Sequence, residues 1–216
     1  YATPEWVKDA GAKGVNYNFG FWNQGGVTPD GKYAFLAHSI GRNWLPVTQL
    51  DRGWVHDGAL SVFDGKTGRY MTTVLLDDPE LGAAEPWGVA ADEKTIAVTH
   101  FGSSEISLID RAGFEARLFE RMNEDISTDL TFMQGIRTRV KTLKQGPRGV
   151  ALENGKAVVK SYLQDDPGVD EGRLLWHDAR LCFQQWQSCG SCHPEGGSDG
   201  MEWNFPAAGV GNPEKT

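Results

Sequence analysis

The hydrophobic positions in the first 165 residues repeat as short apolar runs separated by turns. Three segments open on Gly-Val, at Gly26, Gly88 and Gly149, and are spaced 62 and 61 residues apart. The first two match position for position over thirteen residues and end at His38 and His100. A tight turn and then a run rich in β-branched residues follow each opening, which predicts pairs of strands.

A second apolar run follows in the first two units, over residues 59–64 and 105–110, and ends in aspartate before an expected turn. Strand and turn alternating at a fixed period are typical of β-propeller blades. A β-sandwich with chance similarity between its strands is the alternative. We therefore expect a mainly β fold, a partial propeller with incomplete blades over residues 1–166, followed by a small α-helical domain over 167–216.

Residues 129–144 interrupt this pattern. Leu130, Met133, Ile136 and Val140 lie at helical spacing, which predicts a short amphipathic helix with Met133 as a packing residue. The third unit has no second apolar run, and apolar residues between 174 and 183 predict a further helix instead.

Composition narrows the function classes. The 216 residues are 39% hydrophobic and 23% charged, with a formal charge of −8, so an acidic chain without a basic run does not favour nucleic acid as a partner. No stretch approaches the 18 apolar residues of a membrane span. The first residues do not resemble a signal peptide, so either one was removed or the chain is part of a longer protein.

The chemistry concentrates at Cys189-Gly190-Ser191-Cys192-His193, a C-x-x-C-H sequence. Thiols at this spacing reach the two vinyl groups of one haem, and the next histidine supplies a proximal nitrogen to the iron. A thioredoxin-like motif would need a βαβ setting, and a zinc site a second ligand pair at regular spacing. The motif thus predicts one covalent haem c, and with it a periplasmic, extracellular or cell-surface location.

The sixth iron ligand has three candidates. Met201, eight residues after His193, would give a Met/His pair suited to electron transfer. His177 precedes the motif and is otherwise a surface or packing histidine. An open site would suit peroxide or another small ligand.

Other residues near the motif are expected to have packing roles, and a functional role is the alternative for some of them. Cys182 is expected to be a buried small hydrophobe. Trp176, Trp186 and Trp203 are expected to pack around the porphyrin, and an electron path through them is the alternative.

Two further groups have weaker functional interpretations. His38 and His100 either face one propeller mouth together or each satisfy a neighbouring backbone group. Four acidic residues before the motif form either a solvated hinge or a weak calcium site, although their spacing is irregular: Asp165, Asp166, Asp170 and Glu171.

The segment around the motif resembles the first haem-binding segment of di-haem cytochrome c peroxidases and MauG-like proteins. The earlier part of the chain is similar to YncE-like propellers that are fused to such a module, through stretches such as GRNWLPVTQLDRGW, ALSVFDGKTG and EPWGVAAD. The residues that match the haem-binding segment are Gly172, Leu175, Asp178, Arg180, Leu181, Ser188, Cys189, Cys192, His193, Asp199 and Gly200.

This resemblance implies a c-type cytochrome that transfers electrons through one haem, with the propeller as a docking scaffold. The alternatives are a peroxidase-like or MauG-like oxidoreductase acting on peroxide, and a binding module with a structural haem. A second C-x-x-C-H is missing from the chain, and two and a half blades cannot close a ring. The implied partners are therefore a redox protein such as another cytochrome, a larger complex, or missing segments that complete the propeller and supply a second haem.

Overall fold

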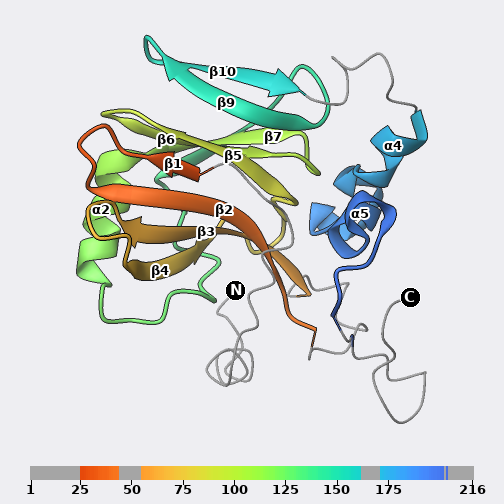
Figure 1. Cartoon of the computed structure of the whole chain (residues 1–216), viewed down its shortest axis with the longest axis horizontal. Coiled ribbons are helices and arrows are strands. Elements are labelled where there is room, and N and C mark those ends of the chain that lie inside the picture. The colour runs from red at the N-terminus through yellow and green to blue at the C-terminus, as the bar shows by residue number, and fades with distance from the viewer. Residues whose placement is uncertain (1–24, 44–54, 162–170, 202, 204–216) are drawn as a thin grey trace.

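The computed structural model describes residues 25–43, 55–161, 171–201 and 203. They form a mainly β fold of antiparallel sheets, followed by short helices (Figure 1). Within these residues the sheets do not close into a ring. The first sheet has the order β1-β2-β3-β4. Its strands are β1 (Gly25–Val27), β2 (Tyr33–Gly41), β3 (His56–Asp64) and β4 (Tyr70–Leu75).

The second sheet has the order β5-β6-β7-β8 and the third has two strands, β9 and β10. The second comprises β5 (Pro86–Ala91), β6 (Thr95–His100), β7 (Glu105–Asp110) and β8 (Arg137–Lys141). The third comprises β9 (Pro147–Glu153) and β10 (Lys156–Ser161). We call residues 25–43 and 55–161 the β-domain.

The repeated Gly-Val openings lie on β1, β5 and β9, and each of these strands pairs with the next strand along the chain. The turn that joins β1 to β2 contains Gly31 at φ 66°, and the turn from β9 to β10 contains Gly155 at φ 73°. Glycine suits both turns because it has no Cβ to clash in this region. The predicted strand pairs and the second apolar runs, now β3 and β7, are confirmed.

The core lies between the first two sheets. Phe35 on β2, Leu60 on β3 and Val98 on β6 are all nearly inaccessible and belong to one apolar cluster. Helix α2 (Arg111–Glu120) adds Phe114, whose ring lies edge-on to Phe35 with centroids 6.0 Å apart. Burial of these side chains stabilises the packing of the two sheets by about 25 cal/mol for each Å² of apolar surface removed from water.

The two equivalent histidines make equivalent contacts. Nε2 of His38 lies 2.8 Å from Oγ of Ser61, and Nε2 of His100 lies 2.7 Å from Oγ of Ser107. Both rings are fully buried. Each therefore links the second strand of its sheet to a serine hydroxyl on the third.

The prediction of a helix over residues 129–144 was wrong. Turns occupy the segment up to residue 136, and β8 follows. Leu130 and Met133 are buried as expected, but they pack from turns, while Arg137–Lys141 pairs with β7 in register. The turn expected after Asp110 was also wrong, because Asp110 caps helix α2 by accepting a hydrogen bond from the amide of Gly113.

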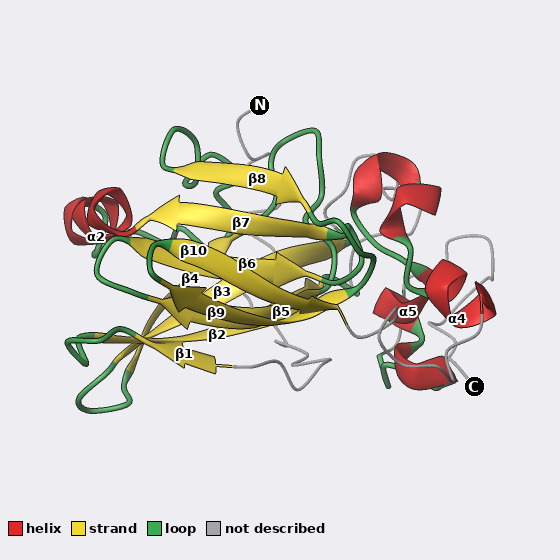
Figure 2. Ribbon diagram, turned by 90° about the horizontal axis from the view of Figure 1, so that it is seen from above, coloured by secondary structure: helices red, strands yellow, loops and turns green. Residues whose placement is uncertain are grey.

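The C-terminal helices lie at one end of the strands, and α2 lies at the other (Figure 2). They comprise α4 (Glu171–Trp176), α5 (Cys189–Cys192) and 3-10 helices at Ala179–Leu181, Phe183–Gln185 and Pro194–Gly196. The helix expected before the motif is therefore broken: Asp178 caps a new 3-10 turn, and Gln184 has a positive φ of 45°. The expected domain boundary at residue 166 lies outside the described residues.

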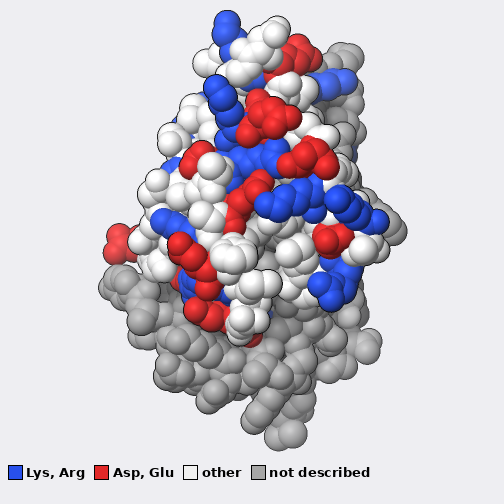
Figure 3. Space-filling model, turned by 90° about the vertical axis from the view of Figure 1, so that its left-hand side faces the viewer, with Lys and Arg blue, Asp and Glu red and all other residues white. Residues whose placement is uncertain are grey.

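The surface at the α2 end mixes both signs of charge (Figure 3). Arg111 pairs there with Asp30 and Glu115, and Lys32 also pairs with Glu115. In the part of the chain that the structure describes, no helix has the length and apolar character needed to cross a membrane.

Candidate functional site

The two cysteines of the C-x-x-C-H motif lie at opposite ends of the short helix α5. Ser188 precedes the helix, and its amide donates to Oγ of Ser191 at 2.9 Å. The amide of His193 donates to the carbonyl of Cys189 at 3.0 Å, which closes the turn. Neither cysteine forms a disulfide within the described residues, and Cys189 is exposed whereas Cys192 is half-buried. The local sequence thus folds into one turn that presents two cysteine thiols and then a histidine.

The ring of His193 is oriented by its own loop. Its Nδ1 lies 2.9 Å from the carbonyl oxygen of Gly197, and its Nε2 makes no hydrogen bond with the described residues. An imidazole that donates from Nδ1 to a carbonyl presents the Nε2 lone pair to a metal. Nε1 of Trp176 donates to the His193 carbonyl at 3.2 Å, so α4 also contacts this residue.

A buried carboxylate of the β-domain contacts the same motif. Glu85, just before β5, is 3% exposed, and its Oε1 accepts hydrogen bonds from the hydroxyls of Ser188 and Ser191. Its Oε2 lies 3.2 Å from Nδ1 of His177. The sequence analysis missed Glu85, because the serines that it binds lie 103 and 106 residues later in the chain.

His177 lies inside this junction. It is 2% exposed, and its ring meets Phe101 edge-on with centroids 4.8 Å apart. A Cβ added to Gly190 would lie 2.4 Å from its Nδ1. The histidine considered as a sixth ligand is therefore packed between β-domain and motif, where it contacts Glu85.

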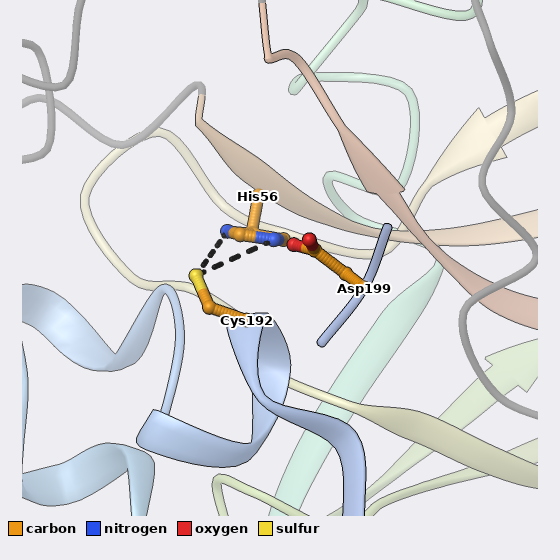
Figure 4. A group of neighbouring side chains, drawn as sticks. All are labelled: His56, Cys192 and Asp199. Carbon is orange, nitrogen blue, oxygen red and sulfur yellow. Dashed lines mark hydrogen bonds between the residues drawn. The ribbon is translucent and has the colours of Figure 1, made fainter. Parts of the chain in front are cut away.

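A second contact joins the motif to strand β3. Sγ of Cys192 lies 3.8 Å from Nδ1 and 3.9 Å from Nε2 of His56, and Asp199 approaches from the other side (Figure 4). One ligand atom from each residue lies within 4.8 Å of the others, a set that suits a metal ion such as zinc. Both carboxylate oxygens of Asp199 already accept hydrogen bonds, from Trp203 Nε1 at 2.9 Å and the Met201 amide at 3.1 Å.

Met201 and Trp203 pack onto the β-domain. Met201 forms an apolar cluster with Trp203, Val55 and half-buried Cys192. A Cβ on Gly41 would lie 2.2 Å from the Met201 methyl carbon, so this thioether fills space that a larger residue on β2 would occupy. The Trp203 ring lies 4.8 Å from that of His56.

Trp186 and Cys182 also lie near the motif. Trp186 is buried, and a Cβ on Gly82 would meet its Cα at 2.4 Å, so its backbone packs against the loop before β5. Burial, followed by the nearby thiols of Cys189 and Cys192, raises the pKa of Cys182. This half-buried third cysteine is therefore a neutral thiol beside the motif at ordinary pH.

Several large apolar side chains stay exposed on the C-terminal helices. These are Leu175, Trp176, Leu181 and Phe183, which are 49%, 37%, 66% and 52% exposed. The four lie within nine residues of the sequence, and large exposed apolar side chains are common where a ligand or partner binds. Of the acidic candidates for calcium, Glu171 is exposed, and Asp165, Asp166 and Asp170 lie outside the described residues.

The residues present fit a covalently bound haem. Covalent attachment needs two thiols outside any disulfide, and Cys189 and Cys192 lie one helical turn apart. The iron needs an oriented histidine, and His193 has its Nδ1 on a carbonyl with Trp176 beside it. Cys189 and Cys192 would hold it, and His193 Nε2 would bind its iron.

Comparisons with known proteins point to one enzyme. Over 67 residues, 31% of this chain, the sequence is 36% identical to hydrazine synthase subunit beta of Kuenenia stuttgartiensis. A solved structure of Kuenenia stuttgartiensis hydrazine synthase matches 68% of this chain with a TM-score of 0.59 at 24% identity, which shows the fold alone. No protein-family model matches the chain.

The chain is thus homologous in part to hydrazine synthase subunit beta. It spans 17% of that relative's length and 46% of the matched chain in the solved structure.

Proposed function

We propose that the chain is a c-type cytochrome component of a multi-subunit redox assembly. It transfers single electrons through one haem that is bonded to Cys189 and Cys192, with His193 as the proximal iron ligand. When bound, the haem supplies the one-electron couple. The protein supplies attachment, orientation and a path to its partner.

One observation carries this proposal: the hydrogen bond between His193 Nδ1 and the Gly197 carbonyl, next to two cysteines that form no disulfide within the described residues. This bond fixes the tautomer with the proton on Nδ1 and turns Nε2 outward as a ligand. A second contact, from Trp176 Nε1 to the His193 carbonyl, anchors the backbone of the ligand residue. Partners of this kind around a ligating histidine strengthen metal binding.

The β-domain would serve as the docking scaffold. We propose that its sheets are blades of a partial propeller, because equivalent strands carry the same Gly-Val openings and the same histidine–serine contacts. The similarity to hydrazine synthase subunit beta, a subunit by name, supports an assembly with partner chains. A covalent haem further implies a periplasmic or extracellular location.

The test is an optical one on the whole chain, produced with a haem-attachment system and exported. The pyridine haemochrome spectrum should be that of haem c at one haem per chain. A protein without bound haem, or with haem that organic solvent extracts, would contradict the proposal. Zinc in place of haem would instead favour the set formed by His56, Cys192 and Asp199.

A second function is favoured by the placement of the two candidate sixth ligands. Met201 is packed against Gly41, and His177 Nδ1 faces Glu85. With both engaged on the β-domain, the far side of the iron would be open to a small ligand, as in a peroxidase-like or MauG-like oxidoreductase acting on peroxide. A ferrous haem that binds carbon monoxide, together with peroxide turnover, would favour this function, whereas a low-spin haem indifferent to carbon monoxide would favour electron transfer.

A further inference from the structure

We infer that Glu85 of the β-domain is a positioning residue for the haem-binding segment and places a buried negative charge beside it. The inference rests on the proposed function for its effect on the haem, whereas its effect on the segment does not depend on haem. It assigns to the β-domain a direct part in setting the properties of the redox site.

The contacts of Glu85 reach the residue before each motif cysteine and the segment that precedes the motif. Oε1 accepts from the hydroxyls of Ser188, directly before Cys189, and Ser191, directly before Cys192. Oε2 lies 3.2 Å from His177 Nδ1. One carboxylate therefore holds the entrance of helix α5, its interior and the preceding segment at once. Hydrogen bonds to a carboxylate are about twice as strong as those between neutral groups.

The fit around this carboxylate is tight. A Cβ on Gly190 would lie 2.4 Å from His177 Nδ1 and 3.3 Å from Glu85 Oε1. Of the two residues between the motif cysteines, Gly190 thus leaves room for the Glu85–His177 pair, and Ser191 donates to Glu85. Glu85 itself has a φ of 55°, a costly backbone conformation that a side chain with a specific role can explain.

Backbone hydrogen bonds hold the rest of the segment against the same loops. The amide of Gly82 donates to the Gln184 carbonyl at 2.8 Å, and the amide of Ala179 donates to the Gly102 carbonyl at 2.9 Å. The haem-binding segment therefore cannot shift relative to Glu85 without breaking these backbone hydrogen bonds, which involve residues before and after Glu85 in the chain.

The charge of Glu85 is not matched by a fixed cation. Among the described residues, no lysine or arginine forms an ion pair with Glu85, and its polar partners are two hydroxyls and an imidazole. A buried anion favours the oxidised iron, which carries one more positive charge than the reduced iron. Its interaction is strong because the interior screens charge weakly.

Two variants separate the geometry from the charge. Glu85→Gln keeps the shape and leaves an oxygen to accept from the serines, while Glu85→Leu also removes the hydrogen bonds. Glu115 is a matched control, because it is a partly buried carboxylate on α2, at the opposite end of the β-domain. Glu115→Gln and Glu115→Leu are the corresponding controls.

The first measurement is hydrogen–deuterium exchange of the peptide that contains residues 188–193, with and without haem. In the wild type the amides of Ser188, Ser191 and His193 are hydrogen-bonded. Glu85→Leu should speed their exchange by at least about tenfold, since local opening sets this rate, and Glu115→Leu should not. Equal exchange in Glu85→Leu and wild type would overturn the positioning role, even if no haem binds.

The second measurement is the haem midpoint potential. Glu85→Gln should raise the midpoint potential by about 59 mV, which for one electron corresponds to a tenfold higher reduced-to-oxidised ratio at a fixed ambient potential. Glu115→Gln should leave the midpoint potential unchanged. A wild-type potential in Glu85→Gln would overturn the charge effect. A wild-type chain without covalent haem would refute the proposed function instead, and the exchange measurement would still decide the positioning role.

Discussion

Sγ of Cys192 lies 3.8 Å from Nδ1 of His56, a residue 136 positions earlier in the chain, on strand β3. The second cysteine of the motif is therefore in contact with the β-domain. Glu85 of the β-domain also accepts hydrogen bonds from Ser188 and Ser191, so two β-domain side chains contact the motif segment. The motif and the β-domain are thus joined by side-chain contacts, and several variants test this.

Replacing His56 should loosen this junction. Its Nδ1 lies 3.0 Å from Oε1 of Gln187 as well as near Cys192. We expect His56→Ala to lower the free energy of unfolding by about 1–2 kcal/mol, because a hydrogen bond and a ring contact with Trp203 are lost. In a double-mutant cycle with Gln187→Ala, urea unfolding should give a coupling energy of about 1 kcal/mol. Additive effects would show that this hydrogen bond contributes nothing.

Gly190→Ala should be poorly tolerated. Its Cβ would lie 2.4 Å from His177 Nδ1, well inside contact distance, so helix α5 or the His177 ring must shift. We expect a loss of about 1–3 kcal/mol in the free energy of unfolding, which is typical of overpacking.

The matched control for this variant is Gly149→Ala on β9, where the added Cβ would be 3.4 Å from the nearest atom, Cβ of Lys160. Its unfolding midpoint should stay near that of the wild type. Equal midpoints for Gly190→Ala and Gly149→Ala would contradict the close approach at the junction.

The buried histidine–serine pairs should contribute to stability in both sheets. Ser107→Ala leaves Nε2 of buried His100 without its partner at 2.7 Å, and the expected loss is about 1–3 kcal/mol. Ser61→Ala should cost more, since Ser61 also lies 2.8 Å from the hydroxyl of Thr73. Thermal unfolding of the two variants tests this order, and a more stable Ser61→Ala would refute it.

Stability should peak near pH 6.5. Burial lowers the pKa of His38 and, even further, that of His100, where Arg139 and Arg137 add to the effect. The unfolded chain therefore binds more protons at these sites below pH 6.5, and stability falls as the medium becomes acidic. Burial and the charge of Asp57 raise the pKa of Asp77 to about 8. The folded chain then binds more protons at this site between about pH 4 and pH 8, which lowers stability as pH rises.

Above pH 6.5 the Asp77 effect acts alone among these three groups. Between pH 6.5 and 8 it should remove about 2 kcal/mol from the free energy of unfolding. Urea unfolding across this range measures the slope. The slope should vanish in Asp77→Asn, and a variant with the wild-type slope would show that another group titrates.

The strand pairs could be predicted from sequence because their signals are local. Each Gly-Val opening, turn and β-branched run lies within thirteen residues, and the paired strands are joined by short turns. The prediction of a helix over 129–144 was wrong. Leu130 and Met133 have helical spacing in the sequence, but both lie in turns, from which their side chains are buried in the core. Val140 alternates with its neighbours on β8 instead, where pairing with β7 determines the structure.

The candidate site could likewise be predicted only where the signal is local in the sequence. The cysteines and His193 are identified by spacing alone, since the motif lies within five consecutive residues. Glu85 and His56 have no local signal, because their contacts with the motif span more than one hundred residues. His177 was identified, but sequence could not show that its ring faces a carboxylate of the β-domain.

The most direct test of the central claim is the intact mass of the whole chain under denaturing conditions, with its cysteine variants. Wild type and Cys182→Ser should both carry the added mass of one haem, because Cys182 lies outside the motif. The double variant Cys189→Ala/Cys192→Ala should carry none. An unmodified wild-type mass, or haem that persists in the double variant, would contradict covalent attachment at the motif.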